Sequence, residues 1–580
     1  MGSSLCSLAG SDAAHGMQFP MHVVRVSDFL RMEGVPESHA SLKQQGLLHV
    51  WKPGMFTIFV SHQWLGSQHA DPDGFHTAVL REILLGIVDG SLSVEIDIAS
   101  ASFGRKHRID EDQRRQVSEG FLFYDWFAIP QITVRTAGIN EAKTRTHAAL
   151  AINSIPAYVD AADLFIALVP HVYVAAQQKW CDQTSWMSRG WCRAELWLHM
   201  LSNKSDTSVI LVNSKKEAKF MYVLEWLKNT IVCGDFTVEA DRAVVARLGE
   251  RALKDKLQQL KKSGPLSTYR FFIAHMASML GHTKRPWSLR KFLASFQFAS
   301  LEEAASDQSS MPGALCATLC GDVGILRLLA QCRADMNMRV SGLIELGYPN
   351  GQQLLVVAAK SGQPAPVLAT LIELRADVLA ETKMGASVAN FVRSPQQLQV
   401  IMEARADLHS SHEPYGFTPL GNAAASAGSD SDTIEAMLKV RCDPNPPLHG
   451  LGFSPLQLAI THSRGEKTPL RTVRLLLEHR ADPNALAVQS GRFGSVCQEA
   501  IKEVAVLGRQ KSTYFNRTFS ILPGLSPIGQ AALVGDARIT QLLLDFKADA
   551  SVPCDIGLFP EDIAEENGHD HLLPLLLVSL

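Results

Sequence analysis

Apolar and polar residues follow two different patterns along the 580 residues of this chain, and the change comes near residue 300. Up to that point, short apolar runs typical of buried strands alternate with longer amphipathic stretches typical of helices. Strands that alternate with helices predict a parallel sheet and therefore an α/β domain. The apolar runs are Met55 to Val60, Phe121 to Ile129, Asp163 to Val169 and Ser208 to Val212. The predicted helices are Phe75 to Val88, Glu141 to Ala161, Trp191 to Leu201, Lys215 to Thr230 and a longer helix with apolar positions from Val244 to Leu260.

Beyond residue 300, the string Arg-Ala-Asp or a near copy of it appears six times, each time after a leucine-rich stretch that predicts a helix with one buried face. The aspartates are 42, 30, 36, 39 and 67 residues apart, and the last interval indicates an interrupted unit. Serine or threonine followed by proline precedes three copies. This pair is typical of a helix start, because the hydroxyl oxygen accepts a hydrogen bond from a free backbone amide of the first turn. Proline fits the first turn because its position there needs no amide hydrogen bond. The pairs are Thr418-Pro419, Ser454-Pro455 and Ser526-Pro527, and the motifs begin at Arg333, Arg375, Arg405, Arg441, Arg480 and Lys547.

The order of capped helix, glycine turn, leucine helix and Ala-Asp turn resembles the ankyrin repeat, which is a turn plus two antiparallel helices in about 33 residues. The resemblance covers residues 312–580 and implies an all-α solenoid of about six to seven repeats, with an insertion near residues 489–520. Stacked repeats of this kind bind proteins, so the resemblance implies a partner protein on the concave face.

The turns between an Ala-Asp mark and the next capped helix are the expected points of contact with that partner, since recognition residues collect in loops on a rigid scaffold. The alternative for each single residue is an ordinary solvated turn. Two turns offer the candidates, which are His409, His412, Tyr415, Asn445, Leu448 and His449.

The composition excludes several classes of protein. Apolar residues make up 46% and charged residues 19%, a balance that is too apolar and too weakly charged for a disordered chain. A net charge of −3 gives no overall field for nucleic acid or an anionic membrane, so neither is expected as a partner. Ten cysteines without a CxxC pair predict neither a disulfide scaffold nor a metal site.

No segment has the pattern of a secretory signal or a transmembrane helix, because no run approaches about 18 consecutive apolar residues. The sequence therefore predicts a soluble, cytoplasmic protein. The start of the chain nearly matches a myristoylation signal after Gly2, but the position that requires serine or threonine holds Cys6. Acylation at Gly2 or Cys6 is the alternative to an ordinary flexible terminus.

Polar and aromatic residues stand at the carboxyl ends of the predicted strands, where open α/β sheets bind their ligands. The first apolar run is followed at once by a serine, a histidine and a tryptophan, and the second delivers an aspartate beside an aromatic residue. We therefore expect these four side chains near one another at one edge of the sheet. They are Ser61, His62, Trp64 and Asp125.

A tryptophan and a glutamate in the third predicted helix add to this set. Trp191 and Glu195 are four residues apart, so an indole and a carboxylate share one face of that helix. Four features in this order resemble the TIR domain, the flavodoxin-like signalling module of Toll and interleukin-1 receptors and plant resistance proteins. They are the strand that ends in Ser61-His62, the aspartate Asp125, the apolar third strand and the motif Trp191-Cys192-x-x-Glu195-Leu196. The resemblance covers about residues 55–230.

The resemblance implies a domain that associates with other proteins, including further copies of itself, and that needs no cofactor. In enzymatic TIR domains, the glutamate of this motif is required for cleavage of NAD at the nicotinamide bond, and the matching residue is Glu195. A carboxylate suits this chemistry because bond breaking builds positive charge on the ribose. The residues then expected to bind NAD, as the substrate, are Ser61, His62, Trp64, Asp125 and Trp191.

Three departures from the TIR pattern leave two functions open. About 20 residues separate Pro170 from Trp191, which is roughly double the usual distance. A polar stretch from Arg105 to Arg115 lies between the first two strands. The segment from Ala128 to Gln131 replaces the usual proline-glycine loop. The two functions are a non-catalytic signalling scaffold and an NAD hydrolase that is targeted by its ankyrin repeats. The predicted boundaries are 1–50 for an N-terminal extension, 51–235 for the TIR-like domain, 236–300 for a helical extension and linker, and 312–580 for the ankyrin repeats.

Overall fold

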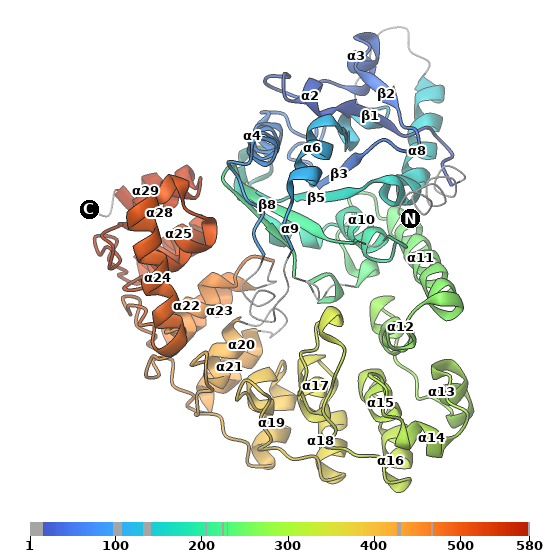
Figure 1. Ribbon diagram of the computed structural model, residues 1–580, viewed down its shortest axis with the longest axis vertical. Helices are drawn as coiled ribbons and strands as arrows, with labels where there is room; N and C mark the ends of the chain where they lie inside the picture. The colour runs from blue at the N-terminus through green and yellow to red at the C-terminus, as the bar shows by residue number, and fades with distance from the viewer. Residues whose placement is uncertain are drawn as a thin grey trace. The chain divides into compact units, whose positions relative to one another are not determined.

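The chain folds into two compact units (Figure 1). One, the α/β unit, comprises Met1–Tyr222 and Asn229–Lys256, and the other, the repeat unit, comprises Val223–Lys228 and Leu257–Leu580. Gly2 and Cys6, the expected acylation positions, lie outside the described residues. The structure, a computed structural model, describes residues 16–96, 107–131, 141–204, 206–222, 225–228, 230–425, 431–465 and 468–577.

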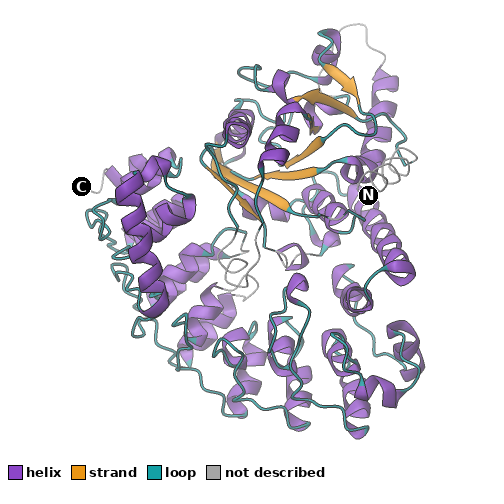
Figure 2. Ribbon diagram, in the orientation of Figure 1, coloured by secondary structure: helices purple, strands orange, loops and turns teal. Residues whose placement is uncertain are grey.

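The α/β unit is built on a seven-stranded mixed sheet (Figure 2). Its strands are β1 (His22–Arg25), β2 (Leu48–Val50), β3 (Thr57–His62), β4 (Phe121–Tyr124), β5 (Leu164–Leu168), β8 (Val209–Ser214) and β9 (Glu217–Phe220). They lie in the order β2-β1-β4-β3-β5-β8-β9. The four central strands are parallel, as the alternating pattern predicts, and β1, β2 and β9 run antiparallel to their neighbours. A separate hairpin of β6 (Val172–Val174) and β7 (Lys179–Cys181) follows β5.

The central strands are buried on both faces of the sheet. Phe59 of β3 stacks on Phe123 and on Phe165, with ring centroids 4.8 Å and 5.4 Å apart. Right-handed crossovers place helices on both faces, because the step from β3 to β4 runs in the opposite direction to the steps from β4 to β5 and from β5 to β8. The first step contains α4 (Phe75–Asp89), and the other two contain α8 (Glu141–Ala161) and α10 (Gly190–Met200), which contact each other.

Two segments of the α/β unit differ from their predicted structure. The prediction of a helix from Lys215 to Thr230 is wrong, since this segment contains β9 and the 3₁₀ turn η2 (Glu225–Lys228). The helix propensity of these residues is outweighed by strand pairing. The segment forms β9, which pairs with the edge of β8, for example through Ile210 and Phe220. The sheet also begins before residue 51, since β1 and β2 fall in the segment that the sequence assigns to an N-terminal extension.

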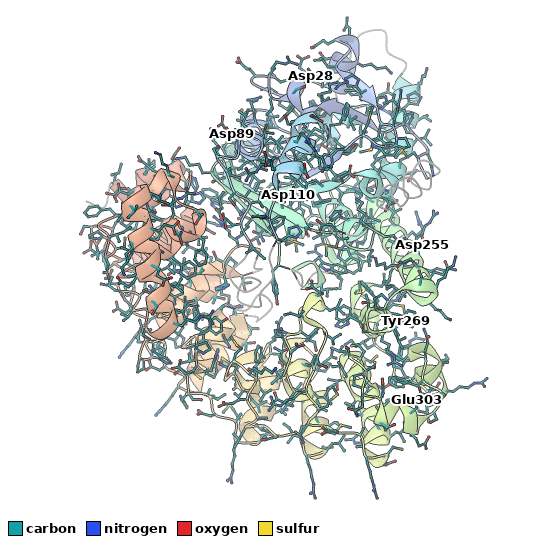
Figure 3. The ribbon with its side chains drawn as sticks, viewed as in Figure 1. Asp28, Asp89, Asp110, Asp255, Tyr269 and Glu303 are labelled. Carbon is teal, nitrogen blue, oxygen red and sulfur yellow. The ribbon has the colours of Figure 1, made fainter. Side chains whose placement is uncertain are left out.

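The polar stretch between the first two central strands contains α6 (Glu111–Glu119). The Asp110 side chain, which is labelled in Figure 3, accepts a hydrogen bond from the Gln113 amide at 2.8 Å. The Gln113 side chain accepts one from the Asp110 amide at 3.1 Å, which makes a capping box. This helix ends directly before β4 and packs against α4 and α2 (Val26–Phe29). It therefore lies at the amino end of β4, away from the predicted site.

The repeat unit is a stack of helix pairs, as the recurring motif predicts (Figure 1). In the described residues, the pairs are α15 (Gly313–Cys320) with α16 (Val323–Gln331), α17 (Leu354–Lys360) with α18 (Ala365–Glu373), η5 (Val388–Phe391) with α19 (Pro395–Glu403), α20 (Pro419–Ala425) with α21 (Ser431–Lys439), α22 (Pro455–Thr461) with α23 (Pro469–Glu478), α26 (Pro527–Val534) with α27 (Ala537–Asp545), and α28 (Pro560–Glu566) with α29 (Leu573–Leu577). The second helices contact one another in the order α16, α18, α19, α21, α23 and α27. Between α23 and α26, α24 (Gly491–Leu507) and α25 (Tyr514–Ile521) form the insertion expected near residues 489–520.

The hydroxyl-proline pairs begin helices as predicted. Ser454, Ser526 and Thr418 each accept a hydrogen bond from the backbone amide three residues later, at 3.2, 3.2 and 3.1 Å. The proline that follows each of them is the first residue of α22, α26 or α20. The sequence therefore sets where these first helices start.

Three helices precede the repeats within the same unit: α12 (Leu266–Met279), α13 (Leu289–Phe296) and α14 (Leu301–Ser306). Arg270 of α12 is buried and forms an ion pair with Asp307 at 2.7 Å. It also donates to the carbonyl oxygens of Phe296 at 2.7 Å and Met311 at 3.0 Å. These contacts attach the three helices to the first repeat. The stretch predicted as a helical extension and linker over residues 236–300 is divided between the two units, and α11 (Asp241–Ser263) crosses the boundary between them.

Candidate functional site

The parallel strands bring the predicted polar residues to one edge of the sheet. Ser61 and His62 are the last residues of β3, and they pair with Ala167 and Leu168 of β5. Asp125 directly follows β4. The connection from β3 leads to β4 on one side, whereas the connection from β5 leads to β8 on the other, so the strand order reverses between β3 and β5. Ligand sites of open α/β sheets lie at the carboxyl ends of the strands at such a point.

Glu195 reaches this edge from α10. The Ser61 hydroxyl donates to Glu195 Oε2 at 2.6 Å and accepts a hydrogen bond from the Trp186 indole Nε1 at 3.0 Å. Ser61 and Trp186 are buried, whereas Glu195 is half-buried. The carboxyl group is therefore positioned by β3 and keeps partial access to solvent.

A second hydrogen-bonded set joins the ends of β3 and β4. His62 Nε2 and Asp125 Oδ1 are 2.7 Å apart, and the Trp64 indole donates to Asp125 Oδ2 at 2.8 Å. The ring of Tyr124 stacks on His62, with centroids 4.1 Å apart. The His62 side chain is 2% exposed and that of Asp125 is 30% exposed, so the carboxylate is the accessible member of this set.

The two carboxyl groups of the site have opposite pKa shifts. Burial raises the pKa of Glu195 to about 8, and the charge of Asp125 adds to this effect while the Ser61 hydrogen bond opposes it. Burial also acts to raise the pKa of Asp125, but the charge of His62 and the hydrogen bonds from His62 and Trp64 bring that pKa below its usual value. At neutral pH the site therefore holds one carboxylate and one carboxyl group that is mostly protonated.

The structure directs Trp191 away from this set. Its indole Nε1 donates to Asp241 Oδ2 at 2.9 Å, at the start of α11. The sequence placed the indole of Trp191 beside Glu195, four residues along the same helix. The indole that lies closest in the hydrogen-bond network of Glu195 is instead that of Trp186, through Ser61.

Trp186 comes from the segment after β5, which is about twice as long as the TIR pattern predicts. This segment forms the β6–β7 hairpin and α9 (Gln183–Ser188). The Ser185 hydroxyl donates to Gln63 Oε1 at 2.9 Å, which attaches α9 to the residue after β3. The one signal in the sequence is the length of the segment itself, and that length does not indicate which of its residues reaches the site.

The six candidate contact residues of the repeat unit differ in how accessible their side chains are. His409 is exposed. His412 is buried, and its Nδ1 lies 3.0 Å from the carbonyl oxygen of Met384, so it supports the turn from within. The half-buried side chains are those of Tyr415, Leu448 and His449.

The sixth candidate, Asn445, links two neighbouring repeats. Its Nδ2 donates to the Arg480 carbonyl oxygen at 2.7 Å, and its Oδ1 accepts a hydrogen bond from the Asp482 amide at 2.8 Å. Asn337 and Asn484 make the same pair of hydrogen bonds to the repeats that follow them. The asparagine at this position is therefore part of the stacking of the repeats.

Replacing Asn445 by alanine is expected to lower the free energy of unfolding of the repeat unit by about 1–2 kcal/mol, because two inter-repeat hydrogen bonds are lost. Urea unfolding of the full chain, followed by far-UV circular dichroism, measures this change. Asn445→Asp keeps the acceptor and loses the donor, so its effect should lie between those of the wild type and Asn445→Ala. Equal stability of all three proteins would show that these hydrogen bonds do not hold the repeats together.

Comparison with known proteins identifies part of the repeat unit. Residues 451–487, which contain α22 and α23, match the ankyrin repeat family model. Among solved structures, the chain is similar to the crystal structure of the human ASB11 ankyrin repeat domain, with 18% identity and a TM-score of 0.32, over 48% of this chain and 97% of that chain. No curated protein matches the chain. The repeat unit thus contains an ankyrin-repeat helical region, and ankyrin repeats are protein-interaction modules.

In the part of the chain that the structure describes, no helix has both the length and the apolar character needed to cross a membrane.

Proposed function

We propose that this protein is an interaction scaffold in which the ankyrin repeats bind a partner protein and the α/β unit, as a TIR-like domain, associates with other copies of itself. The stack of helix pairs, with its ankyrin repeat at residues 451–487, carries the first part of this proposal. Such a stack presents an extended surface built from successive turns and helices.

Two features of the α/β unit support the TIR-like part. Numbered in chain order, its four parallel strands lie in the order 2-1-3-4, which is the start of the flavodoxin-like order. Glu195, from the Trp-Cys-x-x-Glu-Leu motif, reaches the carboxyl end of β3 through its hydrogen bond with Ser61. The antiparallel strands β1, β2 and β9 and the β6–β7 hairpin are additions to that pattern.

Affinity capture tests the binding of a partner. The full-length chain is immobilised and exposed to an extract of the cells that make it, with and without an excess of free chain. The proposal expects a discrete protein that the free chain displaces. Sedimentation velocity over a range of concentrations tests self-association, and a monomer mass at every concentration would contradict that part.

A second candidate function is cleavage of NAD by the α/β unit. The observation that favours it is the position of Glu195, which is hydrogen-bonded to Ser61 where the strand order reverses instead of pointing into bulk solvent. NAD is then the substrate, and no cofactor is needed. As nicotinamide leaves, the ribose gains positive charge, which an ionised Glu195 beside it stabilises.

If the α/β unit cleaves NAD, the rate should rise as the pH is raised through about 8, because Glu195 becomes an anion there. Glu195→Gln, which cannot ionise, should lower nicotinamide release by about 100- to 1,000-fold. Glu119→Gln is the matched control, since Glu119 is exposed on α6. Absence of nicotinamide release from the folded full-length chain near pH 9 would remove this candidate and leave the scaffold.

A further inference from the structure

Six turns of the repeat unit share a backbone conformation that their residues rarely adopt. The residue that opens each recurring motif has a positive φ, and its amide donates to the carbonyl oxygen three residues back. The next amide donates to the carbonyl oxygen five residues back, which completes a Schellman motif at the end of each second helix. We call these residues the basic ladder. They are Arg333 (φ 63°), Arg375 (67°), Arg405 (64°), Arg441 (67°), Arg480 (69°) and Lys547 (68°).

Glycine is the usual residue at this position of a Schellman motif, because it has no Cβ to strain a left-handed backbone. Within the described residues, only Gln178 and Gln297 are further non-glycine positions with positive φ. The repeat unit does use glycine between its paired helices, as at Gly321 (φ 75°) and Gly535 (φ 82°). A basic residue thus occupies this position in all six turns, although glycine would relieve the strain of the left-handed backbone. Residues held in such rarely adopted backbone conformations point to a function.

The fold itself does not use these six side chains. All are exposed, and none forms a hydrogen bond or ion pair with the residues that the structure describes. A cation near a helix C-terminus is favourable. However, a cation in the last helical turn gives the same benefit in ordinary geometry, as Lys439 does in α21. The helix dipole therefore does not explain why the strained position is basic.

The basic ladder runs without a break along the unit. The second helices that it follows contact one another in order, from α16 to α27. Figure 1 labels this row from α16 to α23. Asn337, Asn445 and Asn484 donate to the backbone carbonyl oxygen of the ladder residue in the next repeat, at 3.0, 2.7 and 3.2 Å. The third of these hydrogen bonds joins the two sides of the α24–α25 insertion, so the insertion does not interrupt the row. Packed helices are about 8–10 Å apart, so we expect neighbouring ladder residues to recur at about that spacing.

Each ladder residue is followed two positions later by an aspartate. The aspartate accepts a hydrogen bond from the amide two residues beyond it, at 2.8 or 2.9 Å in all six turns. The alternation of cation and anion prevents the continuous positive surface that attracts nucleic acid. Five of the six cations are arginines, and each guanidinium can bind one carboxylate through two parallel hydrogen bonds.

We propose that the basic ladder binds an extended acidic segment of a partner protein, with one carboxylate on each cation. In a polyproline II segment, which is extended and has three residues per turn, every third side chain lies on the same face and recurs at about 9 Å, because each residue adds about 3.1 Å. This distance matches the spacing of the repeats. The partner segment therefore carries aspartate or glutamate at every third position. The inference rests on the proposed role of the ankyrin repeats in binding protein, and it names the chemistry of the partner.

Two fluorescent peptides test this inference against the full-length chain. Both have about 18 residues and the same composition of glutamate, glycine and serine, but one carries glutamate at every third position and the other carries all its glutamates in one block. Fluorescence anisotropy should show about tenfold tighter binding of the spaced peptide, because only that peptide engages several cations at once. Equal affinities would show attraction by bulk charge alone and would overturn the inference. Tighter binding of an oligothymidylate of equal charge would also overturn it.

Substitutions in the ladder give a second readout. A triple glycine variant removes three cations and relieves the backbone, so its melting temperature should not fall, while its affinity for the spaced peptide should fall about tenfold or more. A triple glutamine variant removes the same charges and keeps the strain, and it should lose the same affinity. Arg327→Gln is the control, since Arg327 is exposed on α16 and pairs with Glu373. The positions to change are Arg375, Arg405 and Arg441.

The two readouts separate the ladder from the proposed function. If a folded triple glycine variant binds the spaced peptide as tightly as the wild type, the ladder is not the binding surface. If no spaced peptide binds while the chain still captures a partner protein, the inference about the ladder is wrong and the role of the repeats in protein binding stands.

Discussion

Lowering the pH from about 7 to about 4 is expected to unfold the α/β unit, because four of its histidines are buried in the neutral form. Burial lowers the pKa of His22 and His39 to about 4 and that of His76 and His199 to about 3, from a usual value of 6.5. The rings of His22 and His39 are 4.9 Å apart, so a charge on one disfavours a charge on the other. Neither ring nitrogen of His76 has a hydrogen-bond partner in the described residues.

The direction of the effect follows from proton binding. The unfolded histidines bind protons near pH 6.5, whereas the folded ones bind them only near pH 3 to 4. The stability that they contribute is present above pH 6.5 and is lost as the pH falls through this window, because the unfolded state then binds more protons. One pKa unit corresponds to about 1.4 kcal/mol, so each histidine contributes roughly 3 kcal/mol. The combined contribution of the four histidines is comparable with the whole free energy of unfolding of a domain, which is about 5–15 kcal/mol.

Tryptophan fluorescence follows this transition, since all of the nine tryptophans except Trp226 and Trp287 lie in the α/β unit. His76→Leu should lower the pH midpoint of unfolding and reduce proton uptake on unfolding by about one. His409→Leu, at an exposed turn of the repeat unit, should leave the midpoint unchanged. A fluorescence signal that stays native at pH 4 would contradict the burial of these histidines.

Replacing Leu476 by alanine is expected to lower the free energy of unfolding of the repeat unit by about 2–5 kcal/mol. Leu476 is 0% exposed on α23, which contacts α21, α22 and α27, so the substitution leaves a cavity between three neighbouring helices. Because each repeat contacts only its neighbours, the loss should spread to the repeats on either side. Leu379→Ala is the matched control, since Leu379 is 66% exposed and its substitution should change stability by less than about 0.5 kcal/mol.

Urea unfolding measured by far-UV circular dichroism gives the difference between these two variants, and amide hydrogen exchange locates it. Faster exchange in α21, α22 and α27 of the Leu476→Ala variant is the expected pattern. Equal stability of the two leucine variants would mean that α23 does not pack as the structure has it.

The starts of the repeat helices could be predicted from the sequence because the determining interactions are local. Ser454 and Ser526 cap helices through amides only three residues away, and proline marks the first turn. The handedness of the turn at Arg375 could not be predicted in the same way. Glycine is the residue that signals a left-handed position, and arginine gives no such signal.

The candidate site was predictable only as far as the strand ends. Ser61 and Asp125 meet because parallel strands end at one edge, and Glu195 reaches Ser61 from the helix after β5. Trp191 shares a helix face with Glu195, but its indole donates a hydrogen bond to Asp241, which lies fifty residues later in the chain. Helical spacing cannot predict such a long-range contact. Trp186 lies in a segment whose fold depends on long-range contacts such as Ser185 with Gln63.

The same limit explains the error at Lys215 to Thr230. Lysine, glutamate and alanine favour a helix there, but the edge of β8 offers unpaired backbone groups that a strand can satisfy. Residues far apart in the sequence fix the choice, since Glu95 also bonds β9, accepting from the Phe220 amide at 2.7 Å. Tertiary pairing therefore outweighs local propensity in this segment.

Protein binding by the ankyrin repeats is tested most directly by photo-crosslinking from a single exposed turn residue of the full-length chain. A photoreactive amino acid replaces His409, and the control carries it at Val506, which is 82% exposed on α24. We predict a discrete crosslinked protein from position 409 that an excess of unmodified chain displaces and that position 506 does not yield. The same products from both positions, or no discrete product from position 409 in folded protein, would contradict the role of the repeats in binding a partner.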